Sequence, residues 1–464
     1  MSMSPINVLG PSGSAELLAA GGSGRGRGAA ATTAGEVQLE IDGSDNYASQ
    51  NDEDEQEEVE RFQCSKFVKI LGPGIMVCLA DTDGPCLVTA GESGSLYGYS
   101  LVSCQILLIP ILFAAQELTV RLSLLTNKGL TELIRIHFGV FWARLACAVL
   151  VITCIAAIIS ELACIAQVGE LFGVPMWISS LIVVFLLVLI VATGTFRRLE
   201  LIGVAMGSTQ VLFFLVMFLV RPDWEEVAHG LVETHFDDGK WLKLLAANIG
   251  AVIMPWMLFY QQSACCERKM TVREMTYARL DTVVGASIAQ GVMIAMVIAM
   301  GATLFKQKPQ ELKDVPQMVD ALKPSMGSTA AKLLVAFGAT GASLVAALVV
   351  AITPAWSICE LLGHERSHDK PYSEAKNFYH AFAAVLVAAF VTTVCPEVGD
   401  RAWIMIQVEI LNALLMPVVV GFIFFLAAKR GVLPESYRLK GWYRILLGIV
   451  FGICSILCVY AAFL

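Results

Sequence analysis

Long apolar stretches dominate the chain from residue 67 onward, whereas the first 62 residues are rich in Gly, Ser, Asp and Glu. Most of these stretches reach the roughly 20 residues that an α-helix needs to cross the hydrocarbon core of a bilayer. We expect eleven spanning helices, the first and sixth of them broken: 67–97, 99–124, 141–171, 175–195, 199–220, 244–266, 280–305, 328–361, 376–395, 401–428 and 442–464. The pattern therefore predicts an all-α polytopic membrane protein.

Composition and charge divide the chain into two parts. Hydrophobic residues make up 56% of the 464 residues and charged residues 16%, whereas soluble domains carry about 25% charged residues. Residues 1–62 hold twelve acids and three arginines, which gives this part a net charge of −9. Since the whole chain has a net charge of −8, the remaining residues are close to neutral. Low hydrophobicity with high charge predicts a disordered tail for residues 1–62. Residues 63–464 form the transmembrane domain, with repeats at about 65–220 and 243–428 and a last helix at 442–464. The expected partners are a lipid bilayer and a small ligand, not nucleic acid.

The distribution of Lys and Arg predicts how the helices are oriented. With the N-terminus in the cytosol, twenty of these residues fall at cytosolic ends and loops and nine on the opposite side. Cytosolic loops of membrane proteins carry such an excess of positive charge. We therefore expect the N-terminal tail to be cytosolic, while the host membrane and the oligomeric state stay open.

The first apolar segment contains two carboxylates next to a helix-breaking pair. Asp81 and Asp83 precede Gly84 and Pro85 in the stretch LADTDGPC. A carboxylate at this depth is costly unless it is paired, and proline with glycine interrupts a helix. Unwound backbone is tolerated in a membrane where it lines a cavity, and its carbonyls together with a carboxylate suit a cation. The alternative is a proline kink whose aspartates face a polar bundle interior.

A second interruption occurs in the sixth segment, where Pro255 follows Met254 within apolar sequence. Alone, this pair is typical of a simple kink. Its place at the start of a second set of five helices matches that of Gly84-Pro85 in the first set, and such a match is typical of an inverted repeat whose site lies between the two breaks. Met254 would then offer a thioether, which is a soft ligand for transition metals.

Several other polar residues lie within predicted spans. Gln407 and Glu409 begin the tenth span, two residues apart and thus on different helix faces. Gln407 could supply an amide oxygen, and Glu409 either a second carboxylate or a charge near the membrane end. The sequence also leaves open whether Asp81 or Glu92 joins an ion pathway. For the other polar residues of the second and third spans, Glu117, Glu161 and Gln167, interior pairing with Arg or Lys is the simpler interpretation.

The first and sixth segments resemble those of the Nramp divalent-metal transporters. The family carries Asp-Pro-Gly-Asn in its first helix, between a Gly-Pro pair and a Tyr-Gly-Tyr-like segment, and counting from Gly72 to Tyr99 places Asp83 on the aspartate and Cys86 on the asparagine. Its sixth helix carries Ala-x-x-Met-Pro-His, which reads AVIMPW here. The resemblance covers about residues 65–464.

This resemblance implies a LeuT-like fold of five plus five helices with one extra helix, and transport of a divalent metal ion such as Mn²⁺ or Fe²⁺. The ion is the substrate, and neither a cofactor nor an enzymatic activity is implied. Gln407 resembles a tenth-helix glutamine that joins the family's metal ligands. The ligands that the resemblance implies are therefore Asp83, Cys86, the Ala251 carbonyl, Met254 and Gln407.

Departures from the family pattern change two of these expectations. Gln261 replaces a sixth-helix histidine, and Cys164 replaces a third-helix acid when Glu161 is aligned on the family's aspartate. Both lost groups serve proton movement in the family, and neither glutamine nor a thiol transfers protons near neutral pH as histidine does, which argues against proton coupling. These changes are closer to a divergent branch that includes magnesium transporters, whereas Met254 favours a transition metal, because Mg²⁺ prefers oxygen ligands.

Two other functions remain as alternatives. A sodium-coupled amino-acid transporter could share the fold, but Asp81 and Asp83 would repel an anionic substrate. A metal sensor that does not transport could bind the same ion and signal through the acidic tail. The sequence contains no HExxH motif, no phosphate-binding loop and no Ser/His/Asp grouping that would indicate an enzyme.

Overall fold

The computed structural model describes residues 72–193, 195–312, 314–364, 370, 372–394 and 401–463. The predicted tail, residues 1–62, and the first residues of the first predicted span lie outside the described residues. Within them, helices account for nearly all regular structure, and an isolated bridge between Arg430 and Leu433 is the one β-type pairing found. The predicted all-α fold is confirmed.

The helix bounds follow the predicted spans to within a few residues at most ends. The first set of helices comprises α3 (Pro73–Asp81), α4 (Gly84–Tyr97), α5 (Val102–Thr126), α7 (Val140–Leu171), α8 (Met176–Thr193), α9 (Phe196–Gly207) and α10 (Leu212–Val220), the last two joined by the 3₁₀ turn η1 (Ser208–Val211). The second set comprises α12 (Gly239–Val252), α13 (Pro255–Glu267), α14 (Met275–Met300) with the π-helical turn η3 (Gly301–Phe305), α16 (Ser328–Leu362), α17 (Lys376–Val394) and α18 (Arg401–Ala428), followed by α19 (Gly441–Ala462). Four short elements were not predicted: α6 (Leu130–Phe138), α11 (Trp224–Gly230), α15 (Val315–Met326) and the 3₁₀ turn η2 (Val272–Glu274).

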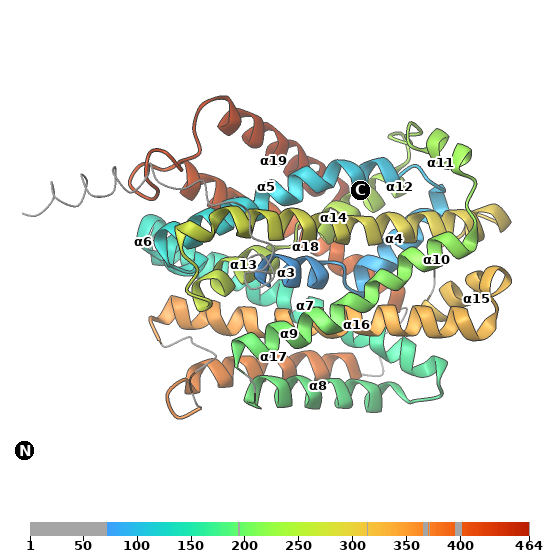
Figure 1. Cartoon of the computed structure of the whole chain (residues 1–464), viewed down its shortest axis with the longest axis horizontal. Coiled ribbons are helices and arrows are strands. Elements are labelled where there is room, and N and C mark those ends of the chain that lie inside the picture. The colour runs from blue at the N-terminus through green and yellow to red at the C-terminus, as the bar shows by residue number, and fades with distance from the viewer. Residues whose placement is uncertain are drawn as a thin grey trace, which may run out of the picture. The chain divides into compact units, whose positions relative to one another are not determined.

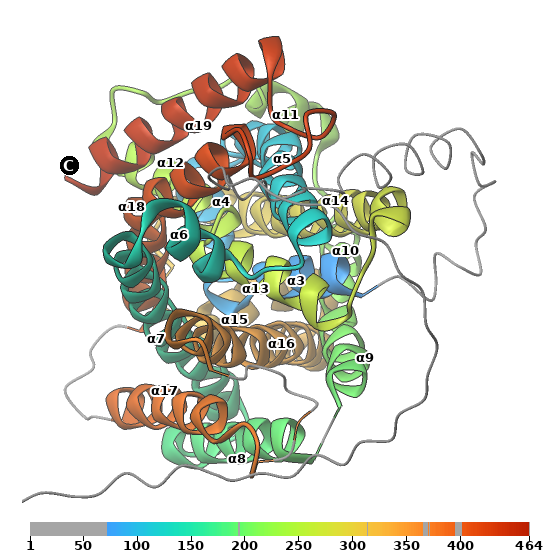
Figure 2. The same ribbon diagram turned by 90° about the vertical axis from the view of Figure 1, so that its left-hand side faces the viewer.

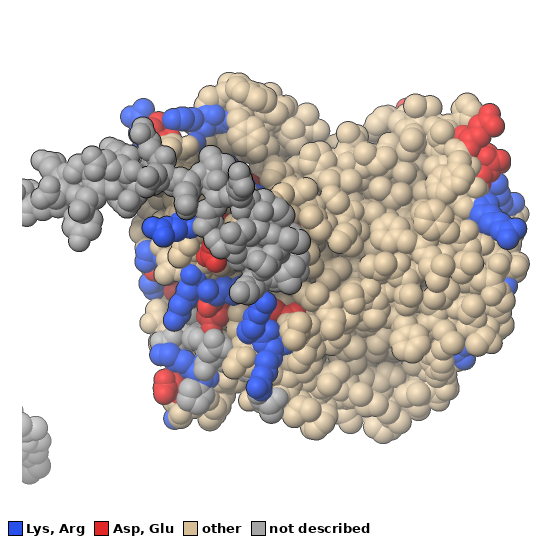
Figure 3. Space-filling view, in the orientation of Figure 1, with Lys and Arg blue, Asp and Glu red and all other residues tan. Residues whose placement is uncertain are grey.

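The apolar helices have the length and composition of membrane spans. In the described residues, nine helical segments are long and apolar enough to cross a bilayer. The other two predicted spans correspond to the shorter α8 and to the broken pair α3–α4, so the total of eleven stays a prediction. In the orientation of Figure 3, basic side chains gather at the end of the bundle where α6 lies, and a wide uncharged band follows. An uncharged band of this kind is what a lipid-embedded surface requires.

Burial separates central from peripheral helices. In the 18-residue apolar stretch of each helix, 28% of the residues of α19 and 33% of those of α17 are buried. The corresponding share is 89% for the segment that contains α12 and α13. Figure 2 shows α8 and α17 side by side at one edge and α19 at the opposite edge, with α3 and α13 in the middle. Every residue of α3 is buried. The two interrupted segments therefore lie in the interior of the bundle.

The first predicted break is confirmed between α3 and α4. Pro85 has no N–H, so it cannot bond the Asp81 carbonyl as a continuous helix would require. The N–H of Gly84 donates instead to Glu161 Oε2 at 3.4 Å. Asp83 adopts an extended backbone (φ −80°, ψ −178°) and caps α4, its Oδ1 accepting the Cys86 N–H at 2.8 Å. Asp83 is thus fixed at the break as the first residue of a new helix.

The second predicted break is confirmed between α12 and α13, and it contacts the first. Pro255 lacks the N–H that would bond the Ala251 carbonyl, and Met254 is extended (φ −78°, ψ 139°) at the start of α13. The Cys86 thiol donates to the Ala251 carbonyl at 3.2 Å. The Ala251 carbonyl, which Pro255 leaves without a helical partner, therefore faces the first turn of α4. Figure 1 shows α3 and α4 one after the other between α5 and α16.

Two halves of the broken segments, α4 and α12, are joined directly. Asn248 Nδ2 donates to Ser93 Oγ at 2.8 Å, and the Tyr97 hydroxyl donates to Asp238 at 2.6 Å. The second bond also holds the pKa of Asp238 below its usual value. Together with the Cys86–Ala251 contact, these bonds link α4 to α12 at three positions along the two helices.

The other two halves, α3 and α13, are fastened mainly to other helices. Asp281 of α14 accepts the N–H groups of Gly74 and Ile75 at 2.7 and 3.2 Å, at the start of α3. Gln261 of α13 accepts from Thr119 of α5 at 3.3 Å. A carboxylate at a helix N-terminus is favourable, because unbonded N–H groups and the positive end of the helix dipole lie there.

Candidate metal site

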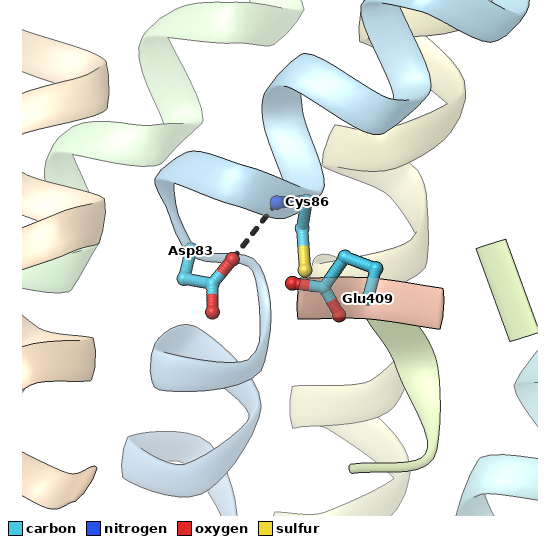
Figure 4. A group of neighbouring side chains, drawn as sticks. All are labelled: Asp83, Cys86 and Glu409. Atoms are coloured by element: carbon cyan, nitrogen blue, oxygen red, sulfur yellow. Dashed lines mark hydrogen bonds between the residues drawn. The ribbon is translucent and has the colours of Figure 1, made fainter. Parts of the chain in front are cut away.

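Three ligand-bearing side chains meet at the first break. Asp83 and Cys86 come from the start of α4 and Glu409 from α18 (Figure 4). One oxygen of each carboxylate and the sulfur all lie within 4.8 Å of one another. Ligands on opposite sides of one small ion at 2.0–2.3 Å are about 4–4.6 Å apart. No other three His, Cys, Asp or Glu side chains in the described part of the chain approach one another as closely. The group has the dimensions of a single-ion site.

Local geometry leaves suitable donor atoms in this group. One oxygen of Asp83 accepts the N–H of Cys86, and the Asp83 carboxyl also forms a side-chain hydrogen bond with Glu161. The sulfur of Cys86 points toward Glu409 in Figure 4 and also contacts the Ala251 carbonyl. Glu409 Oε2 accepts from Asn412 at 3.1 Å, which orients the carboxylate. Two carboxylates, one thiol and one carbonyl therefore converge.

The predicted residues are placed differently with respect to this group. Asp83, Cys86 and Ala251 are brought together by the contacts above. Met254 lies at the same break as Ala251, three residues further on, and is fully buried. Gln407 is half-buried on α18 and lies about 200° around that helix from Glu409. Since Glu409 faces the group, helix geometry directs Gln407 away from it.

Two further carboxyl groups flank the site. Asp81 is 2% exposed, and its Oδ1 has no hydrogen-bond partner among the described residues. Glu161 is fully buried and forms side-chain hydrogen bonds with Asp83 and Ser343. Glu92, further along α4, is half-buried. Glu117, in contrast, forms ion pairs with Arg121 and Arg279, as the simpler interpretation of the sequence predicted.

The electrostatics of the group favour a positively charged ligand. Among the described residues, the buried Glu117 and Glu200 pair with arginines, whereas none of the four acids at the break, Asp81, Asp83, Glu161 and Glu409, forms an ion pair with Lys, Arg or His. Unpaired carboxylates in such surroundings are expensive. Oxygen donors suit divalent cations in general, while sulfur donors favour transition metals over Mg²⁺.

Sequence reasoning underestimated two residues of this region. The sequence leaves Glu409 open between a ligand and a charge near the membrane end, and it favours ion pairing for Glu161. The available signal was the same for both, a single carboxylate within a long apolar stretch. Such a signal marks a polar environment but does not say which side chains share it.

The sequence of the chain matches a family of known proteins and individual members of it. A family model described as natural resistance-associated macrophage protein-like, or Nramp, matches residues 74–464. The divalent metal cation transporter MntH of Verminephrobacter eiseniae is 29% identical over 285 residues, which cover 58% of this chain and 64% of MntH. The match thus spans less than two thirds of that relative's length.

Solved structures share the fold at low sequence identity. The manganese transporter of Eremococcus coleocola, crystallised with an aromatic bis-isothiourea compound, superposes with a TM-score of 0.68 at 18% identity, covering 88% of this chain and 89% of that chain. A nucleobase-cation-symport-1 family transporter in a closed conformation superposes with a TM-score of 0.51 at 13% identity, covering 84% and 90%. The predicted LeuT-like architecture is confirmed by this likeness.

Proposed function

The chain belongs to the Nramp family, and from that premise we propose that it is a secondary transporter that moves a divalent metal cation across a membrane by alternating access. The relative and the structural neighbour described above are named as transporters of divalent metal cations and of manganese. Neither name implies catalysis, and we propose no enzymatic activity.

One observation carries this proposal: Asp83, Cys86 and Glu409 converge at a helix break next to the Ala251 carbonyl. In this proposal Asp83 and Glu409 neutralise the ion, and Cys86 and the Ala251 carbonyl complete its inner shell. Met254 contributes its thioether from the second break. The tenth-helix role predicted for Gln407 is assigned to Glu409.

The donor set supports an ion of the Mn²⁺ or Fe²⁺ class over Mg²⁺. Cys86 and Met254 place two sulfur atoms at the breaks, and Mg²⁺ prefers oxygens and retains water. An amino-acid substrate is disfavoured, because a carboxylate substrate would meet buried acids and no buried basic side chain in the described residues. Proton coupling is not part of the proposal.

Alternating access would use the hydrogen bonds that link α4 to α12. The paired α4 and α12 tilt as one unit relative to the surrounding helices, while α3 and α13 detach from their partners on the other side. We place the N-terminus in the cytosol on the basis of the excess of Lys and Arg on that side.

The test is Mn²⁺ uptake by the full chain reconstituted in liposomes. Asp83→Asn keeps the shape of the side chain and its capping oxygen but removes the charge, and it should abolish uptake. Asp223→Asn, which alters an exposed helix-capping carboxylate at α11, is the matched control and should transport normally. Uptake by Asp83→Asn at the level of this control would refute the assignment.

A further inference from the structure

One face of α9 and η1 runs along α3, the short helix that ends at the first break. Four residues of this face follow one another at intervals of three or four: Glu200, Gly203, Gly207 and Gln210. Residues at this spacing lie on the same side of a helix. A Cβ added at Gly203 would lie 2.6 Å from Met76 Cε, and one added at Gly207 would lie 2.8 Å from Leu79 Cβ. The two glycines therefore let α9 approach α3 closely.

Gln210, the last residue of this face, is bonded directly to the first break. It lies in the 3₁₀ turn η1, is fully buried, and its Nε2 donates to the Leu79 carbonyl at 2.5 Å. A short 3₁₀ turn within a longer helix often marks a functional position. The bond thus connects the middle of one spanning segment to the last turn of α3.

The Leu79 carbonyl needs this donor because of the break. In a continuous helix it would accept the N–H of Asp83, four residues later. The last such bond in the described residues of α3 runs from the Thr82 N–H to the Cys78 carbonyl at 3.3 Å. Asp83 is extended, and its N–H bonds its own carboxylate instead. Gln210 therefore supplies the hydrogen bond that the unwound residue withdraws.

The orientation of the Gln210 amide follows from its partner. A main-chain carbonyl can only accept, so the NH₂ group of the amide must face Leu79. The other end of the amide, Gln210 Oε1, has no hydrogen-bond partner among the described residues. The bond to Leu79 is therefore the polar contact that orients this side chain.

Loss of the amide would favour a different conformation of the break. A buried carbonyl is rarely left without a donor. Without Gln210, the chain itself could supply one by returning the Asp83 N–H to the Leu79 carbonyl, which would extend α3. A helical Asp83 would no longer cap α4 through the Cys86 N–H. Its carboxylate would then leave the group that it forms with Cys86 and Glu409.

We propose that Gln210 is a positioning residue for the divalent ion, because its amide holds the Leu79 carbonyl and thereby keeps Asp83 unwound and directed at the ion. Gln210 is not a ligand and acts through Leu79. Its capacity to donate is what matters, since the contacts of Gly203 and Gly207 already pack α9 against α3. This inference rests on the proposed function, which assigns the ion to Asp83.

The experiment measures the Kd for Mn²⁺ by titration calorimetry and the Tm without metal, both on the purified full chain. Gln210→Met keeps the length of the side chain but cannot donate. It should raise the Kd about tenfold, the factor that corresponds to one lost hydrogen bond. Because a buried bond is lost, the Tm should fall as well.

Gln262→Met is the matched control. Gln262 is also fully buried, its Nε2 donates to the Lys128 carbonyl at 2.9 Å, and its Oε1 likewise has no partner among the described residues. It lies about two helical turns beyond Met254 on α13. Gln262→Met should therefore lower the Tm as Gln210→Met does, but it should bind Mn²⁺ with the Kd of wild type.

The outcomes separate this inference from the proposed function. Equal Kd values for Mn²⁺ in Gln210→Met and Gln262→Met would overturn the positioning role and leave Gln210 a purely structural residue. A wild type that does not bind Mn²⁺ would refute the proposed function and this inference with it. Should Gln210→Met not fold, Gln210→Leu takes its place, with Gln262→Leu as its control and the same criterion.

Discussion

The carboxylate of Asp281 determines how firmly α3 is held, and its replacement makes a measurable prediction. Asp281 is 2% exposed and bonds the N–H groups of Gly74 and Ile75 through its two oxygens. Asp281→Asn keeps the size of the side chain but removes its charge and one of its acceptor oxygens. The start of α3 should then detach more often from α14, without any change in the residues of the candidate metal site.

The magnitude follows from the two bonds. Hydrogen bonds to a charged group contribute about 1.5–3 kcal/mol each, and a carboxylate at a helix N-terminus adds up to about 2 kcal/mol in buried surroundings. Since asparagine retains one neutral bond, we expect a net loss of about 2 kcal/mol. That loss corresponds to an increase of roughly 30-fold in the population with α3 detached.

Cys78 reports this population directly. It lies on α3, is fully buried and donates to Gln116 of α5 at 3.3 Å. N-ethylmaleimide should therefore label Cys78 about 30-fold faster in Asp281→Asn than in wild type, measured by mass spectrometry of the Cys78 peptide. Asp238→Asn changes a carboxylate that caps α12 instead and should leave the rate unchanged. Equal labelling of Cys78 in the two variants would show that Asp281 does not hold α3.

Two further substitutions test the metal selectivity and the stability of the bundle. Cys86→Asn exchanges a sulfur donor for an oxygen donor, so Mg²⁺ should compete with Mn²⁺ uptake more effectively and Cd²⁺ less; unchanged competition curves would exclude the sulfur as a ligand. Glu117→Gln leaves Arg121 and Arg279 without their buried carboxylate, and because Arg279 is 38% exposed we expect a loss of about 2 kcal/mol, seen as a lower Tm. Glu435 pairs with Arg438, but its side chain is 65% exposed, so Glu435→Gln should leave Tm unchanged. Similar shifts of Tm in the Glu117 and Glu435 variants would contradict the role of burial.

Long apolar stretches made most of the fold predictable, because a helix that faces lipid must satisfy its own backbone over its whole length. The breaks were predictable for the complementary reason. Proline removes a backbone hydrogen-bond donor, and the positions of Pro85 and Pro255 are read directly from the sequence. The short helix α15 was missed although its start carries a recognisable signal, an Asp314 cap followed by Pro316 in the first turn. With 12 residues, α15 is shorter than a membrane span, so the length of apolar sequence that identifies the other helices does not reveal it.

The site was less predictable, because it depends on rotation about helix axes and on which helices meet. Gln407 and Glu409 are equally polar in the sequence, and only the packing of α18 against α4 and α12 decides that Glu409 faces the break. Gly84 of α4 lies against Glu161 of α7 and Ser343 of α16, and these three helices are far apart in the chain. Nothing in the spacing of these residues indicates their contact.

The Cys86–Ala251 hydrogen bond bears on how the proposed transporter could reset between cycles. This bond links α4 to α12 across the two breaks. In the proposal a bound metal would take both the sulfur and the carbonyl as ligands, so the metal would replace the bond and the link would persist. A neutral hydrogen bond contributes about 1 kcal/mol, which is little against the attraction of two buried carboxylates for a dication, so it would not hinder loading. The halves α4 and α12 would therefore move as one unit with and without the ion, as a transporter that must reset between cycles requires.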